Sequence, residues 1–187
     1  NICIEINKTP VYLMASEMIP GERFKVGDHV KVYVVEVRET TRGPLVKISR
    51  THPGLVKRLF EIEVPEIQDG SVIIKSIARE AGSRTKIAVY TEDENIDPIG
   101  SCIGPKGSRV ASIVGELKGE KIDIVRYYDD PGDYIAQSLS PANVVNVFVT
   151  EGEKNCRAVV PDNQLSLAIG KEGQNARLAA KLTGWKI

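Results

Sequence analysis

Two short glycine-bracketed segments are the residues whose spacing points most directly to chemistry. They read Ile103-Gly-Pro-Lys-Gly107 and Ile169-Gly-Lys-Glu-Gly173, and each joins two stretches with helical hydrophobic spacing. Glycines at such a junction let the backbone turn without a Cβ, so that a sugar-phosphate backbone can approach the main chain closely. The helix that follows directs its free N–H groups and positive dipole end to the same place, which favours phosphate. A single segment of this kind is equally compatible with a plain tight turn, but two copies in one setting predict a nucleic-acid contact.

Charged and polar side chains surround both segments. Lys106 and Lys171 add positive charge, whereas Glu172 departs from the electrostatic ideal, because a carboxylate in a phosphate cradle repels the ligand. We expect Glu172 to face away or to contact a base edge or a ribose hydroxyl. Pro105 has no N–H, so the first segment offers one donor fewer than the second. The residues predicted to contact RNA are Ile103, Gly104, Pro105, Lys106, Gly107, Arg109, Ile169, Gly170, Lys171, Glu172, Gly173, Asn175 and Arg177.

The elements that must position these segments form a unit that occurs twice. Each copy begins with a short amphipathic helix, continues with two β-rich runs joined by a tight turn, and then enters the two helices around the glycine-bracketed segment. A last strand follows, so the predicted order is αββααβ. The first copy has its helix at 55–61 and strands at 72–77, 86–90 and 121–125; the second has its helix at 133–139 and strands at 144–149, 156–160 and 185–187, the last truncated.

The first 50 residues alternate as half-buried strands do. The predicted strands cover residues 2–6, 11–14, 30–37 and 45–48, separated by turn signals. This pattern suits a five-stranded OB barrel whose first strand lies before Asn1, and such a barrel leaves an open edge for a neighbour to close. Tyr12, Phe24 and Tyr33 are candidates for stacking on bases, although packing within the barrel is the favoured interpretation of each.

Composition excludes several classes of function. Lys plus Arg equals Asp plus Glu at 25 each, so any RNA binding must depend on local geometry and not on a general positive field. The three cysteines lack metal or disulfide spacing, and two histidines leave little from which to build a metal centre or a catalytic triad. We therefore expect no cofactor, no metal, no enzymatic activity and no membrane association, in a reduced cytoplasmic setting.

Two glycine-bracketed loops within αββααβ units resemble KH domains of the prokaryotic type, type II, whose GxxG loop clamps about four nucleotides of single-stranded nucleic acid. A partial OB barrel followed directly by two such domains resembles the NusA family of bacterial transcription elongation and termination factors. Matching segments include Ser49-Arg-Thr-His-Pro-Gly-Leu55, Lys121-Ile-Asp-Ile-Val-Arg126 and Ser166-Leu-Ala-Ile-Gly-Lys-Glu-Gly-Gln-Asn-Ala-Arg177.

The resemblance implies an α+β multidomain chain. Its expected parts are a partial antiparallel OB β-barrel of the ribosomal S-one type at residues 1–51, a first KH domain at 52–128 and a second at 129–187. It also implies binding to single-stranded nascent RNA and to RNA polymerase during pausing, termination and antitermination, with the principal polymerase-contacting domain expected before Asn1.

Two alternative functions stay open on the sequence. One is the RNA-binding tail of a phosphorolytic exoribonuclease, although that family places a single KH domain before its OB module. The other is a protein-interaction scaffold whose KH folds do not touch RNA, which the zero net charge and Glu172 favour.

Overall fold

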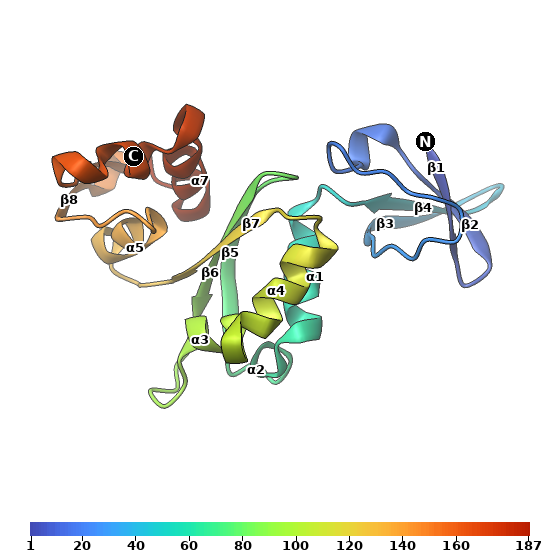
Figure 1. Ribbon diagram of the computed structural model, residues 1–187, viewed down its shortest axis with the longest axis horizontal. Helices are drawn as coiled ribbons and strands as arrows, with labels where there is room; N and C mark the ends of the chain where they lie inside the picture. The colour runs from blue at the N-terminus through green and yellow to red at the C-terminus, as the bar shows by residue number, and fades with distance from the viewer.

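The computed structural model describes residues 1–187, and the chain passes from a β-rich N-terminal part through two mixed α/β parts (Figure 1). The N-terminal part consists of two antiparallel hairpins, β1 (Ile2–Ile6) with β2 (Thr9–Leu13) and β3 (Tyr33–Thr40) with β4 (Gly43–Ser49). The hairpins pack through a small core of Val11, Leu13 and Ile48. These separate two-stranded sheets form an open, partial OB fold, as predicted.

The predicted strand at 30–37 begins later than expected, at Tyr33. The backbone of Lys31 is engaged elsewhere: its N–H donates to Glu116 Oε1 at 3.1 Å, and its carbonyl accepts from Arg50 Nη1 at 2.6 Å. Because the N–H bonds to Glu116 of the neighbouring domain and the carbonyl bonds to the Arg50 side chain, neither group is free to join a sheet ladder.

The first αββααβ unit follows the predicted order, with one short helix added. Its elements are α1 (Pro53–Glu63), the added α2 (Pro65–Gln68), β5 (Ile73–Glu80), β6 (Arg84–Tyr90), α3 (Pro98–Ile103), α4 (Ser108–Glu116) and β7 (Lys121–Arg126). The helix α1 starts as its sequence dictates, because Pro53 occupies the first turn and His52 Nδ1 accepts from Gly54 N at 2.8 Å. The sheet order is β5-β6-β7, with β6 and β7 parallel, and its main core includes Val56, Phe60 and Ile87.

The second unit repeats this plan with a shorter sheet. It comprises α5 (Pro131–Ser138), β8 (Asn146–Thr150), β9 (Asn155–Val159), α6 (Leu165–Ile169) and α7 (Gln174–Thr183). Asp130 caps α5 by accepting from Asp133 N at 3.0 Å. The predicted strand at 185–187 is represented by a single parallel bridge between Asn155 and Lys186.

The two α/β units are packed directly on each other. Helix α7 of the second lies across the sheet face of β5 and β6 that the first unit's own helices leave uncovered. Small residues, Ala78 and Ala88, let the helix approach closely, and Leu178 and Leu182 fill the contact. Lys86 Nζ adds a polar link by donating to Ser140 O at 2.8 Å. The short linker and this packed face hold the two units as a tandem.

A buried arginine joins the partial barrel to the first α/β unit. The Arg50 side chain is fully buried, and its guanidinium is paired with Glu22 and donates to Glu116 Oε1 at 3.2 Å and to the Glu116 carbonyl at 3.0 Å. Because Glu116 ends α4, this one side chain fixes the barrel against the helix that follows the first glycine-bracketed loop. In the whole structure, no helix has the length and apolarity that crossing a membrane requires.

Candidate nucleic-acid interface

The opening glycines of the two loops adopt the same unusual backbone conformation. Gly104 has φ 77° and ψ 171°, and Gly170 has φ 80° and ψ 169°, a region open essentially to glycine alone. Space also requires glycine at both places. A Cβ on Gly104 would lie 2.5 Å from Arg109 Cγ, and one on Gly170 would lie 2.7 Å from Asn175 N. The closing glycines Gly107 and Gly173 are left-handed, with φ 73° and 76°.

The residue before each closing glycine is also left-handed, although it has a side chain. Lys106 and Glu172 both have φ 55°, which places them at the same point of their loops. Pro105 therefore corresponds to Lys171. Lys106 and Lys171, which are predicted to act alike, therefore do not occupy equivalent positions in their loops. At the left-handed position, the first loop carries a positive charge and the second a negative charge.

Both loops open directly into a helix that lacks a side-chain cap, although the first N–H of each helix, from Ser108 or Gln174, donates to a carbonyl of its own loop. Helix α4 follows Gly107 and α7 follows Gly173, and neither helix has a side chain that hydrogen-bonds to its first-turn amides. Such uncapped N–H groups and the positive end of the helix dipole attract an anion. Each loop therefore combines close backbone approach with donors suited to phosphate.

Arg109 lies beneath the first loop. Its Nη1 donates to Glu66 Oε2 on α2 at 2.9 Å and to the Ser101 carbonyl on α3 at 2.7 Å. Its aliphatic stem occupies the space that a Cβ on Gly104 would need. The guanidinium is therefore tied to two parts of its own domain next to the loop.

Arg177 lies beneath the second loop, but its partner belongs to the other domain. Its Nε and Nη2 donate to the two carboxylate oxygens of Glu80 on β5, each at 2.8 Å, and its Nη1 donates to the Glu172 carbonyl at 3.0 Å. The hydrogen bond from Arg177 lowers the pKa of the Glu80 carboxyl. Gln174 joins this contact by donating to Ser83 Oγ at 2.7 Å.

Asn175, predicted to contact RNA, has a side chain inside the domain with only 2% of the residue exposed. Its Nδ2 donates to Leu139 O and Ala168 O, both at 3.0 Å, and ties the end of α5 to α6. The side chain therefore joins two parts of its own domain, and direct RNA contact by Asn175 remains a prediction.

Apolar side chains stand exposed beside both loops. Ile103 is 37% exposed and Ile169 is 46% exposed, at the ends of α3 and α6. Leu165 and Leu167 on α6 are exposed at 52% and 44%. Helical spacing in the sequence does not single out Leu165 and Leu167, because it does not show which face of a five-residue helix is covered.

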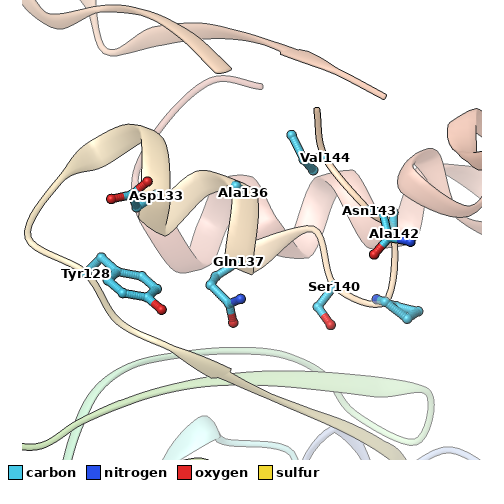
Figure 2. A pocket seen from close by; sticks show the side chains of 9 residues that line it. Tyr128, Asp133, Ala136, Gln137, Ser140, Ala142, Asn143 and Val144 are labelled. Atoms are coloured by element: carbon cyan, nitrogen blue, oxygen red, sulfur yellow. The ribbon is translucent and has the colours of Figure 1, made fainter. Parts of the chain in front are cut away.

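A hollow of about 490 Å³ lies along α5 and the segment that follows it, with Tyr128 of the linker in its lining. Tyr128, Gln137 and Ser140 point to the same side of α5 within it (Figure 2). Gln137 Oε1 accepts from Arg126 N at 3.3 Å, and the Arg126 guanidinium lies 5.7 Å from the centre of the Tyr128 ring. No short-range pattern in the sequence marks this hollow, because its lining comes from the linker, α5 and the segment after α5.

A second, more apolar groove of about 810 Å³ lies between the two hairpins of the partial barrel. Tyr12 is largely exposed in its lining. The other two aromatic candidates pack within the protein: Tyr33 stacks on His52 at 4.7 Å, and Phe24 lies 5.7 Å from the Arg50 guanidinium. Of the three, Tyr12 alone lies in the groove.

Comparisons with known proteins agree with this geometry. Residues 50–127 match the family model for the NusA-like first KH domain, and residues 131–187 match that for the NusA-like second KH domain. Over this whole chain, the transcription termination/antitermination protein NusA is 60% identical in Bacillus subtilis and in Halalkalibacterium halodurans, and 45% identical in Thermus thermophilus. The chain covers 50%, 49% and 48% of those proteins, so it spans about half the length of the curated relatives. The chain belongs to the NusA family.

Proposed function

We propose that this chain is the RNA-binding region of a transcription termination and antitermination factor, and that its two GxxG loops grip single-stranded nascent RNA. The observation that supports this proposal best is the shared backbone conformation of the two loops, each leading into an uncapped helix. The names of the curated relatives support the role in transcription.

In the proposed mechanism, one phosphate lies against each loop. The missing Cβ atoms at Gly104 and Gly170 let the RNA backbone reach the main chain, and first-turn amides of α4 and α7 beyond Ser108 and Gln174 donate to phosphate oxygens. Lys106 and Lys171 contribute charge, and Ile103 and Ile169 offer apolar surface on which a base can rest. Affinity then falls with salt, with a slope of about −0.7 per neutralised phosphate.

The two sites lie toward opposite ends of β5. Arg109, under the first loop, is bonded to Glu66, whose carbonyl accepts from Val72 N just before β5 begins. Arg177, under the second loop, is bonded to Glu80, the last residue of β5. Eight residues of strand span roughly 26 Å. One RNA strand that reaches both loops therefore runs along the tandem.

Holding two weak sites at a fixed spacing makes the second contact intramolecular. Such linkage can raise avidity by roughly 10²–10⁴ without new contacts. The chain should therefore prefer unpaired tracts long enough for two footprints of about four nucleotides each. Contact with RNA polymerase belongs to the same proposal, and it depends on the relatives' transcriptional role and not on any surface described above.

The competing scaffold function has two supporting observations, the zero net charge and the carboxylate of Glu172 in the second loop. Titration of the isotopically labelled chain with an unstructured RNA of about a dozen nucleotides, followed by NMR, separates the two. We expect amide shifts to concentrate at residues 103–109 and 169–177. Shifts absent from both loops would contradict the proposal and favour the scaffold.

A further inference from the structure

The arginine beneath the second loop is held by a residue of the first KH domain. Arg177 uses its three guanidinium nitrogens at once: two hold the Glu80 carboxylate, and the third holds the carbonyl of Glu172 within the second loop. Planar, two-point pairing of this kind fixes the guanidinium in orientation as well as in position. Through Arg177, the Glu172 carbonyl of the loop is connected to strand β5 of the other domain.

A second contact supports the same connection. Gln174, the first residue of α7, donates to Ser83 Oγ at 2.7 Å and lies 3.3 Å from Glu80 Oε1. Both Gln174 and Arg177 belong to the start of the helix whose amides face the proposed phosphate. The turn after β5 thus holds this part of the second loop from outside its own domain.

The first loop offers an internal comparison. Arg109 lies beneath it in the same manner, but its carboxylate partner, Glu66, belongs to α2 of the same domain. The first loop is therefore complete within one domain, whereas the second loop depends on domain packing.

We propose that Glu80 is a positioning residue for RNA binding by the second KH domain, and that the second RNA site is shared between the two domains. This inference rests on the proposed function, because it concerns the geometry of that same site. Its consequence is that loosening the contact between the domains weakens the second loop selectively.

Two possible roles of Glu80 predict opposite changes in RNA affinity when its carboxylate is removed. If the carboxylate merely competed with RNA phosphate for Arg177, its removal would free the arginine and tighten RNA binding. If it positions the loop, its removal weakens binding even though the protein loses a negative charge. Three bonds from one guanidinium, one of them to the loop itself, favour positioning.

The test uses Glu80→Gln in the full chain, with the first loop disabled by Pro105→Asp and Lys106→Asp so that RNA reports on the second loop. We expect binding of an unstructured RNA to weaken about two- to fivefold, the range of a well-oriented exposed ion pair. The Gly173 amide, which donates to Gly170 O at 3.1 Å, should exchange faster with solvent. The Arg177 Nε–H resonance should lose its hydrogen-bonded shift.

Two variants serve as controls. Glu66→Gln should disturb the first loop and leave Gly173 exchange unchanged. Glu61→Gln removes the same charge from α1, where Glu61 pairs with Arg58, and should leave both loops unchanged. Unchanged or tighter binding in Glu80→Gln, with Gly173 exchange unaltered, would overturn the inference. Failure of the proposed function is distinct: there, disabling either loop in the parent would leave RNA affinity unchanged.

Discussion

Lys106 and Glu172 occupy the same left-handed backbone position in the two GxxG loops, with φ 55° and ψ 27° in one and φ 55° and ψ 26° in the other. The two loops therefore share a shape and differ in the charge at one defined point. This pairing separates what the backbone contributes to RNA binding from what the side chain contributes.

Replacing Glu172 with lysine should tighten RNA binding at the second loop. The substitution keeps the backbone conformation that Lys106 already tolerates, and it turns a repulsive charge into an attractive one beside the proposed phosphate. The salt slope should steepen by about 0.7 if one more phosphate is neutralised. The matched control is Glu153→Lys on the turn between β8 and β9, and an equal gain from that variant would mean that the effect is only one of net charge.

Replacing the opening glycines with alanine should damage both stability and RNA binding. Gly104→Ala and Gly170→Ala each force a side chain into a glycine-only conformation and into contact with the helix behind it. We expect each to lower the free energy of unfolding by about 1–3 kcal/mol. Gly115→Ala is the control, because Gly115 lies inside α4 with open space around it and should gain about 0.5–1 kcal/mol. Urea unfolding measures all three, and equal effects at the three glycines would contradict this account.

Removing the Arg50 side chain should be far more costly than removing an exposed arginine. Arg50→Ala leaves the buried carboxylate of Glu22 without its partner, and breaking a buried pair in this way costs about 3–5 kcal/mol. Arg58→Ala, which breaks the exposed pair with Glu61, should leave stability nearly unchanged. Calorimetry measures the melting temperature of both variants. Similar melting temperatures would show that the junction between the barrel and the KH domain contributes little to stability.

Stability should fall at alkaline pH because of Cys102, which is buried in α3 next to the first loop. Burial raises the pKa of its thiol to about 12. The unfolded thiol titrates near 8.5, so above that pH the unfolded state releases a proton that the folded state keeps, and the folded state loses stability. From about pH 8 to about pH 10 the loss is roughly 2 kcal/mol. Measuring the free energy of unfolding against pH for the parent and for Cys102→Ala isolates this contribution. If stability depends on pH identically in the two proteins, the loss comes from other groups.

The local features of both sites were predictable from the sequence. Glycine spacing and hydrophobic periodicity were enough to place Gly104 and Gly170 between two helices, because those signals act over a few residues. The helices predicted at 55–61 and 133–139 are present, but they begin two residues earlier, at Pro53 and Pro131, where a capping residue and a proline set the first turn.

Features that depend on domain packing were not predictable. The pair of Arg177 with Glu80 joins residues 97 positions apart, and it exists only because α7 rests on β5. Burial of Asn175 depends on packing within the second domain, since its side chain bonds to the carbonyls of Leu139 and Ala168 in two other segments of that domain. A pattern in the sequence names the residue types at a site but does not show which of them packing removes from the surface.

The most direct test of the central claim is the affinity of the chain for an unstructured RNA of about a dozen nucleotides, long enough for two KH footprints. The parent is compared with Pro105→Asp plus Lys106→Asp and with Lys171→Asp plus Glu172→Asp, each checked for folding by circular dichroism. We predict that either pair of substitutions weakens binding strongly, because each removes one of two linked sites. Binding equal to that of the parent in both folded variants would contradict the claim and place any RNA contact elsewhere on the chain.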